Sequence, residues 1–382
     1  MQTAAQAWLV WELTDSAWML GVVGALRMVP TLVLSLPAGA VADRFAKRNI
    51  LLVTQTVAML QALALAALVY SGLIHVWHVM VLATLLGIVQ SFDMPSRHAM
   101  VIEVSSREDV LNAVSLNSSA FNAGRIVGPA VAGMLISARG TADCFLINGI
   151  SYIATIIALW GIAPRRPTVL ASGRMLTQIR DGLVWVKGQP VARGLLAMIG
   201  VTSLFAMTYA TLLPVFAEKV FGMSSAGYGF LLSSYAAGAL TSAVLLTAFG
   251  HIRPPGKLVT LGSYWFPFSL AGLALAPSYG MGVVALFLTG VGLMLFNAVS
   301  NTMLQTLSPD ELRGRVMSMR TLLFAGMMPA GSLQMGALGQ WLGPRAAVGI
   351  GAAVCLLAAV AACVLLPQLR RSSDEQSHIS EA

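Results

Sequence analysis

The chain has 382 residues, of which 57% are hydrophobic and only 10% are charged, and its mean hydropathy is +0.79. Soluble domains carry about a quarter charged residues, so this much apolar surface requires a solvent other than water, and a lipid bilayer is the one that fits. A disordered chain, a collagen and a cytosolic dinucleotide-binding enzyme are excluded. The net charge of +8 does not indicate nucleic-acid binding, because the 23 Lys and Arg residues are scattered between apolar runs.

The sequence contains no pattern typical of a metal, cofactor or nucleotide site. Cys144, Cys355 and Cys363 stand inside apolar stretches without a C-x-x-C pair, which supports neither a disulfide framework nor a zinc site. Neither an H-E-x-x-H motif nor a phosphate loop occurs. We therefore expect no catalytic residues, no metal and no cofactor, and an energy source other than ATP.

Apolar runs of about 20 residues, the length that crosses a hydrocarbon core, divide the chain. The sequence predicts eleven complete spans, five before a polar connection and six after it, and hence an all-α membrane protein. The predicted spans lie near 17–41, 50–73, 76–101, 111–137, 142–163, 194–217, 226–249, 257–276, 280–304, 312–341 and 344–367.

A shorter apolar segment, Ala4–Leu13, precedes the first complete span. Its residues would rise only about 15 Å as a helix, half of a core about 30 Å thick. Two interpretations are open: a re-entrant or interfacial start, or a first helix whose opening residues precede Met1. We favour the second and expect the reading frame upstream of Met1 to encode roughly 20 more residues, basic and then apolar. A chain lacking half of this helix could also be inactive in transport.

The basic residues predict the orientation, because cytoplasmic loops carry an excess of Lys and Arg. Most of them fall on the side of the loop from Asp43 to Arg48, whereas Arg139, Lys219 and Arg345 fall on the opposite side. The first side is therefore cytoplasmic, and the C-terminus with it. The expected domains are an N-terminal bundle, a cytoplasmic linker with an amphipathic helix from Met175 to Val186, a C-terminal bundle and a cytoplasmic tail. Their bounds are 1–163, 164–192, 193–367 and 368–382.

The two halves of the chain repeat each other. Six residues of the first half recur 203 residues later, and Phe92 and Ser96 recur 204 residues later as Phe296 and Ser300. The six pairs are Ser105 and Ser308, Glu108 and Glu311, Ser115 and Ser318, Phe121 and Phe324, Gly128 and Gly331, and Gly133 and Gly336. Both S-x-x-E copies predict a capping box at a helix start. An even number of spans separates the equivalents, so the repeats are parallel, as in the two halves of major facilitator transporters.

The loop after the first complete span resembles a family signature. It follows the pattern G-x-x-x-D-R-x-x-[RK]-[RK] found between helices 2 and 3 of the major facilitator superfamily, with Ala46 in place of the usual glycine. The resemblance implies that Asp43 docks on the helix start near Ser308 and latches the cytoplasmic side, where unpaired amides and the helix dipole favour a carboxylate. The basic residues alone could instead be positive-inside anchors. The predicted gating residues are Gly39, Asp43, Arg44 and Arg48.

A second signature lies in the span near 111–137. It resembles the g-x-x-x-G-P-x-x-G-G motif of helix 5 in the exporter branches of the superfamily and departs from it at Ala132. The resemblance implies efflux. Small residues four apart also allow close helix packing, which is the alternative interpretation. The motif residues are Gly124, Gly128, Pro129 and Gly133.

Ionisable side chains at membrane depth are costly, so they are candidate functional residues. Arg27 and Arg125 lie about ten and fourteen residues into their spans, near the bilayer middle at 1.5 Å per residue, and Asp93 is the nearest intramembrane acid. These residues form either a structural cluster or a site in which Asp93 titrates against the arginines or the arginines attract an anionic substrate. The predicted cavity residues are Arg27, Asp93, Arg125, Asn122, Asn297, Asn301 and Gln334.

Wider similarity covers most of the chain. The stretches Ala7–Thr14, Phe92–Arg97, Asn112–Gly133 and Asn148–Tyr152 resemble the enterobactin-exporter-like group of major facilitator proteins. The resemblance implies two pseudo-symmetric six-helix bundles that work by alternating access, and proton-driven efflux of a siderophore or drug across the bacterial inner membrane, by a monomer. A proton-coupled importer is the alternative. No arginine occurs in Leu85–Phe92, where the family's helix 4 signature has one, so that residue's proton role is not carried over.

Overall fold

The computed structural model describes residues 1–105, 109–163, 184–249 and 254–366, and these parts are helical, without a β-strand. The described residues form two compact units. Unit 1 contains 1–163 and 217–230, and unit 2 contains 184–216 and 231–366. The amphipathic helix predicted from Met175 is almost wholly outside the described residues, and so is the tail after 367.

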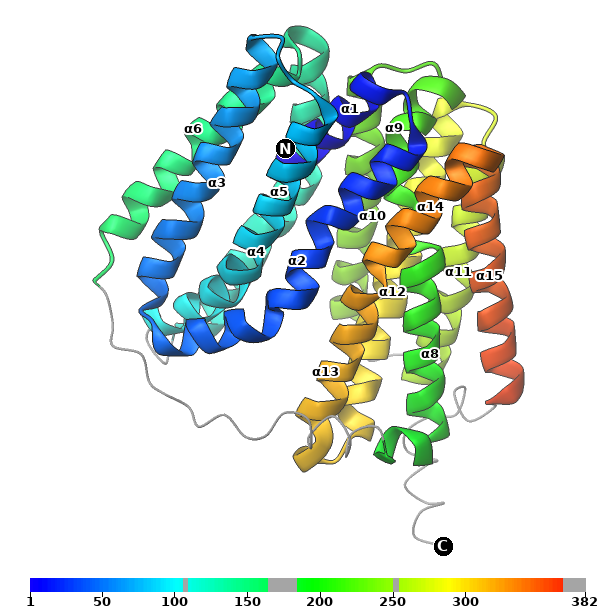
Figure 1. Cartoon of the computed structure of the whole chain (residues 1–382). Helices are drawn as coiled ribbons and strands as arrows, with labels where there is room; N and C mark the ends of the chain where they lie inside the picture. The colour runs from blue at the N-terminus through cyan, green and yellow to red at the C-terminus, as the bar shows by residue number, and fades with distance from the viewer. Residues whose placement is uncertain (106–108, 164–183, 250–253, 367–382) are drawn as a thin grey trace, which may run out of the picture. The chain divides into compact units, whose positions relative to one another are not determined.

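Unit 1 is built from long apolar helices that follow one another through short turns. α2 packs against α4, and α3 packs against α4 and α6, as Figure 1 shows. The turn between α1 and α2 places Asp15 in the left-handed region at φ 46, and the Ser16 side chain caps α2 by accepting from the Met19 amide at 3.4 Å. The helices are α1 (Gln2–Thr14), α2 (Ala17–Arg44), α3 (Lys47–Tyr70), α4 (Val76–Val104), α5 (Val110–Arg139) and α6 (Thr141–Trp160).

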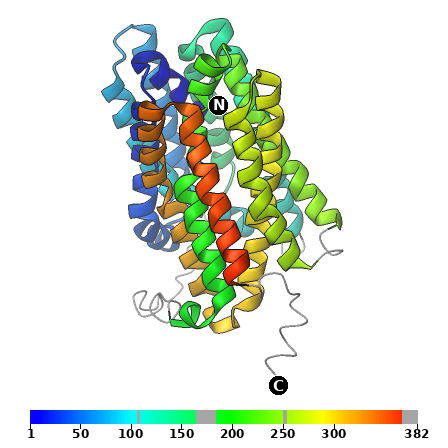
Figure 2. The ribbon, with the colours of Figure 1, turned by 90° about the vertical axis from the view of Figure 1, so that its right-hand side faces the viewer.

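Unit 2 contains the helices that follow the linker. α11 packs against α12 and α15, and α15 lies along α8, which Figure 2 shows in red and green. A hydrophobic core joins α8, α12, α13 and α15 through Leu195, Phe296, Val316 and Ala359. The helices are α8 (Pro190–Phe205), the 3₁₀ turn η1 (Met207–Leu212), α9 (Leu213–Val215), α11 (Pro255–Leu275), α12 (Tyr279–Leu307), α13 (Asp310–Gly326), α14 (Met328–Leu342) and α15 (Pro344–Leu365).

Two elements pass from one unit to the other. The π-helix η2 (Phe216–Val220) begins in unit 2 and ends in unit 1, and α10 (Ser225–Phe249) begins in unit 1 and continues in unit 2. The segment 217–230 therefore belongs to unit 1, although it follows the linker in sequence.

All eleven predicted spans coincide with helical segments, and ten stretches of the described chain are long and apolar enough to cross a membrane. The remaining span corresponds to α5, which has 30 residues but carries a polar run that begins at Asn112. The predicted span near 312–341 is divided into α13 and α14 at Met327. Pro329 in the first turn of α14 explains the division, because proline lacks the amide that would continue the preceding helix.

The predicted capping box at Ser308 is wrong. α13 begins at Asp310 with Pro309 at its N-cap and no side-chain cap, and the Ser308 hydroxyl donates to the Leu304 carbonyl at 2.6 Å. A serine at the C-terminal end of a helix can satisfy its hydroxyl on the carbonyl four residues back, and here it does so at the end of α12. The other copy, at Ser105, extends into residues outside the described range.

Candidate functional site

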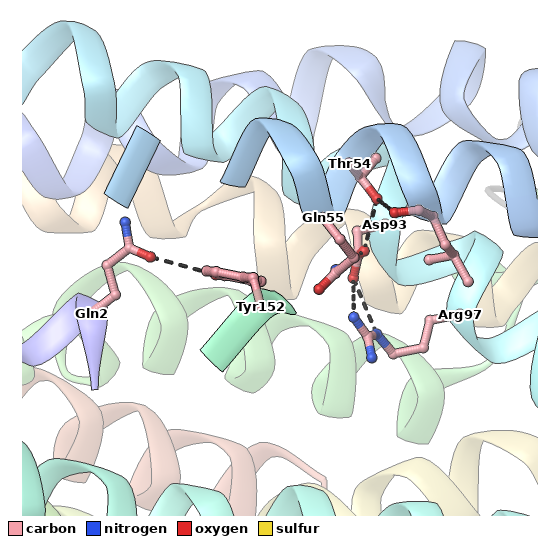
Figure 3. Close-up of polar contacts among 7 residues, drawn as sticks. Gln2, Thr54, Gln55, Asp93, Arg97 and Tyr152 are labelled. Atoms are coloured by element: carbon pink, nitrogen blue, oxygen red, sulfur yellow. Dashed lines mark hydrogen bonds and ion pairs between the residues drawn. The ribbon is translucent and has the colours of Figure 1, made fainter. Parts of the chain in front are cut away.

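The most connected carboxylate at membrane depth is Asp93 of α4. Its Oδ1 accepts hydrogen bonds from Thr54 Oγ1 at 2.9 Å and Gln55 Nε2 at 2.5 Å, both from α3. Its Oδ2 accepts from Arg97 Nε at 3.1 Å and Nη2 at 3.0 Å, one turn along α4 (Figure 3). The Asp93 side chain is only 14% exposed. Its charge is therefore compensated within unit 1 by Arg97, which is an i,i+4 partner, and not by Arg27 or Arg125.

Arg27 of α2 has polar partners but no carboxylate within ion-pair distance in the described chain. Its Nη1 donates to Thr3 Oγ1 at 2.7 Å and its Nη2 donates to Gln90 Oε1 at 3.4 Å. Close packing of α4 permits this arrangement, because a Cβ at Gly87 would overlap the Arg27 carbonyl. Arg27 thus adds a hydrogen-bonded positive charge to unit 1. Arg125 of α5 is exposed, and among the described residues it makes no ion pair.

A buried network of amide side chains ties α1 to its neighbours, and the sequence did not single it out. Gln2 accepts from Asn148 Nδ2 at 2.9 Å and from Tyr152 OH at 3.4 Å, and it donates to Gln61 (Figure 3 shows the Tyr152 contact). Gln61 in turn donates to the Leu82 carbonyl at 3.1 Å. Such side chains hold helices together where the surroundings are apolar. Their signal in the sequence is a polar residue inside an apolar run.

The segment 217–230 is attached to α1 by polar and aromatic contacts within unit 1. Lys219 Nζ lies 2.7 Å from Asp15 Oδ2 and 4.9 Å from the centre of the Trp11 ring, and Trp11 Nε1 donates to Glu218. Trp8 stacks on Tyr228 with ring centres 5.8 Å apart. These contacts explain why the segment groups with unit 1.

The predicted gating residues lie at the end of α2 and the start of α3. Gly39 and Arg44 are in α2, and Arg44 is exposed in its last turn. Arg48 donates from Nε to the Leu159 carbonyl at 2.9 Å and from Nη2 to the Trp160 carbonyl at 3.3 Å. A guanidinium there satisfies unpaired carbonyls and the negative end of the α6 dipole. Asp43 is a residue of α2, and its side chain is outside the described part of the structure.

The helix 5 motif packs backbone against backbone. A Cβ at Gly133 would overlap the Ser225 carbonyl oxygen and lie 2.9 Å from the Cα of Gly229, and Ser225 Oγ donates to the Gly133 carbonyl at 3.2 Å. Pro129 is inside α5, and a Cβ at Gly128 would lie 3.4 Å from the Met1 nitrogen. A Cβ at Gly124 would meet no atom within 4 Å. The close packing that is the alternative interpretation of this motif therefore exists at Gly133.

The predicted cavity residues of unit 2 are on α12 and α14, and Asn122 is on α5 of unit 1. Asn122 and Asn297 each donate to the carbonyl four residues back, at 3.0 and 3.2 Å. Asn301 and Gln334 are half-buried.

Arg320 of α13 contacts Asn297, but the sequence places it on the cytoplasmic flank, and it was not predicted as a site residue. Its distance of ten residues from the helix start is the signal that could have found it. Among the described residues, no cluster of metal ligands occurs.

Comparison with known proteins identifies the family of this chain. The family model of transmembrane secretion effectors matches residues 1–381. The chain therefore belongs to this family of the major facilitator superfamily, and it is a multi-pass membrane transporter.

Two relatives cover most of the chain. The staphyloferrin A transporter of Staphylococcus aureus is 28% identical over 335 residues, 86% of this chain and 82% of the relative. The enterobactin exporter EntS of Shigella boydii serotype 18 is 24% identical over 362 residues, 94% of this chain and 86% of the relative.

Solved transporters share the fold. A structure of the peptide transporter POT in complex with sulfate superposes with a TM-score of 0.75 at 14% identity, over 97% of this chain and 92% of that one. The nucleoside transporter NupG gives 0.73 at 13% identity, over 95% and 94%. The major facilitator fold is thus established for this chain.

Proposed function

We propose that this protein is a secondary exporter that moves a small amphipathic molecule, of the siderophore or drug class, across the bacterial inner membrane at the expense of the proton gradient. The observation that carries the proposal is the similarity of 94% of the chain to a relative named as an enterobactin exporter. A second relative is named as a staphyloferrin A transporter, which supports the same substrate class.

The polar groups of unit 1 supply chemistry that suits this role. Asp93 is a carboxylate within the span Val76–Val101, held by Thr54, Gln55 and Arg97. Asp93 is the carboxylate that we propose as the proton carrier. Arg27, which has no carboxylate partner among the described residues, would attract an anionic substrate. Asp43 is the proposed cytoplasmic latch.

Everted membrane vesicles test the direction and the driving force together. Vesicles containing the protein should accumulate radiolabelled enterobactin or staphyloferrin A when respiration acidifies their interior, and a protonophore should abolish the accumulation. Uptake confined to right-side-out vesicles would establish the importer instead.

The variant Asp43→Asn tests the proposed latch: it should lose accumulation while immunoblots show an unchanged amount of protein in the membrane. Full activity of this variant would remove the latch from the mechanism.

A further inference from the structure

Arg320 places a positive charge within a candidate membrane span of unit 2, about a third of the way along it. It lies ten residues after Asp310, the first residue of α13, and the stretch Asp310–Leu342 is apolar enough to span a membrane. At 1.5 Å per residue, this is about 15 Å along the helix. The guanidinium is therefore about three helical turns from the start of α13.

The protein supplies only some of the hydrogen-bond acceptors that the Arg320 guanidinium requires. Nη2 lies 3.4 Å from both the backbone oxygen and Oδ1 of Asn297, which is long for a hydrogen bond of a charged donor. Nε is buried, and it has no hydrogen-bond partner in the described chain. Cζ lies 5.8 Å from the centre of the Phe324 ring. A buried, charged donor without an acceptor is costly, so Nε of Arg320 lacks the acceptor that would offset its burial.

Unit 2 has no carboxylate that could be this acceptor. Its described residues include only two acids, Asp310 and Glu311, both in the first turn of α13. Asp310 Oδ1 already pairs with Arg313 Nη2 at 2.6 Å. Within the described part of unit 2, the charge of Arg320 is therefore uncompensated.

The internal repeat shows that unit 2 lacks the carboxylate found at the equivalent position of unit 1. Asn297 is the residue 204 positions after Asp93, the displacement that also relates Phe92 to Phe296. In unit 1 the carboxylate of Asp93 faces Arg97 in an ion pair at 3.0 Å. In unit 2 an amide stands at the equivalent position and faces Arg320. The residue 204 positions after Arg97 is Asn301, so the arginine that contacts Asn297 comes from another helix, α13, and no negative charge stands opposite it.

We propose that Arg320, together with Asn297, binds the anionic group of the transported molecule, a carboxylate or a similar oxyanion. The planar guanidinium presents parallel N–H groups that match two oxygens of one anion, and a site at membrane depth strengthens that attraction. The identification of the anion as cargo rests on the proposed function. The existence of an anion site does not rest on the proposed function, because the phosphate of a lipid headgroup is an oxyanion with the same chemistry.

Purified protein in nanodiscs tests the site without any transport step. The probe is 4-fluorobenzoate, followed by the broadening of its ¹⁹F signal, and 4-fluorobenzamide is the neutral control of the same shape. Wild-type protein in phosphatidylcholine nanodiscs should bind the carboxylate at least about tenfold more tightly than the amide. Arg320→Gln should abolish this preference, and Arg320→Lys should keep part of it.

Asn297→Asp is the decisive variant, because it restores the carboxylate found in unit 1 and should suppress the preference while Arg320 stays in place. Equal binding of carboxylate and amide by the wild type, or an unchanged preference in both Arg320→Gln and Asn297→Asp, would overturn the proposal. Loss of the carboxylate preference in nanodiscs that contain phosphatidylglycerol, at a salt concentration that screens the surface charge, would assign the site to an anionic lipid headgroup and overturn its assignment to cargo. Failure of vesicle transport with the carboxylate preference intact would count against the proposed function alone.

Discussion

At the scale of single residues, the ion pairs of this chain differ in how much water reaches them. The carboxylate of Asp93 is 14% exposed and that of Asp310 is 87% exposed, whereas their arginine partners have similar exposures of 42% and 46%. Exposed pairs contribute about 0–1 kcal/mol to stability. Removal of one partner from a buried pair costs about 3–5 kcal/mol.

Asp93→Ala should therefore lower the free energy of unfolding by about 2–3 kcal/mol, a value reduced from the buried limit because Arg97 is 42% exposed. The loss includes the acceptor of Thr54 and Gln55. Asp310→Ala is the matched control and should cost less than about 0.5 kcal/mol. Chemical unfolding in detergent, followed by tryptophan fluorescence, measures both variants. Equal losses would show that the Asp93 cluster is not structural.

Arg48 and Arg44 belong to the same motif but should differ in their effect on stability. Arg48→Ala removes two hydrogen bonds to the last carbonyls of α6, so it should lower the unfolding free energy by about 1–2 kcal/mol. Arg44→Ala, at an exposed position, should change it by less than about 0.5 kcal/mol. The same unfolding titration compares the two variants. If Arg48 acts only as a positive-inside anchor, its variant will match that of Arg44.

The positions of polar and charged residues along the helices were predictable from the sequence, but their partners were not. The spacing of charges within apolar runs indicated Arg27 and Asp93, since depth follows from counting along a helix. The contact of Arg48 with Leu159 joins residues 111 positions apart, and the Gln2–Asn148 bond joins residues 146 apart. No periodicity encodes such pairs. They depend on how helices pack, which is decided by the fold as a whole.

At the scale of helices, one motif offers two glycines in opposite environments. Gly133→Ala would drive a methyl group into the backbone of Ser225 and Gly229, and backbone atoms cannot rotate away. We expect it to lower the unfolding free energy by about 1–3 kcal/mol. Gly124→Ala meets no atom within 4 Å and should be neutral or stabilising by up to about 1 kcal/mol, because alanine favours the helix.

Thermal unfolding of the two glycine variants in detergent provides the measurement, and Gly229→Ala is the reciprocal test. A Cβ at Gly229 would overlap the Pro129 carbonyl and approach the Gly133 Cα to 3.0 Å, so its loss should equal that of Gly133→Ala. If the Gly133→Ala and Gly124→Ala variants had the same unfolding temperature, the close approach of α5 and α10 would not contribute to stability.

The existence of the helices followed from hydropathy, whereas their interruptions did not. Long apolar runs predict spans because the bilayer requires every backbone amide to be bonded within the helix. Hydropathy does not register the change from α8 to the 3₁₀ turn that begins at Met207, or the division at Met327. The division at Met327 is followed two residues later by Pro329, and proline is the signal that a hydropathy scan overlooks.

At the scale of the whole molecule, the internal repeat extends from sequence to buried chemistry. Ser96 and Ser300, related by 204 residues, are both completely buried. Both hydroxyls have no hydrogen-bond partner within the described residues. Equivalent positions in two parallel repeats thus share the same unusual environment. This agreement is the kind that duplication produces, and it supports the equivalence of Asp93 and Asn297.

Orientation is a property of the whole chain that reporter fusions can test. Basic residues are retained in the cytoplasm during insertion, and they gather at the loop from Asp43 to Arg48 and beyond Pro367, whereas the turns at Gly140 and Gly343 have one arginine each. A fluorescent-protein fusion after residue 382 should therefore be bright and a phosphatase fusion there inactive. Phosphatase fused at Gly140 or Gly343 should be active. Active phosphatase at the C-terminus would reverse the predicted orientation and place the loop from Asp43 to Arg48 in the periplasm, where it could not be a cytoplasmic latch.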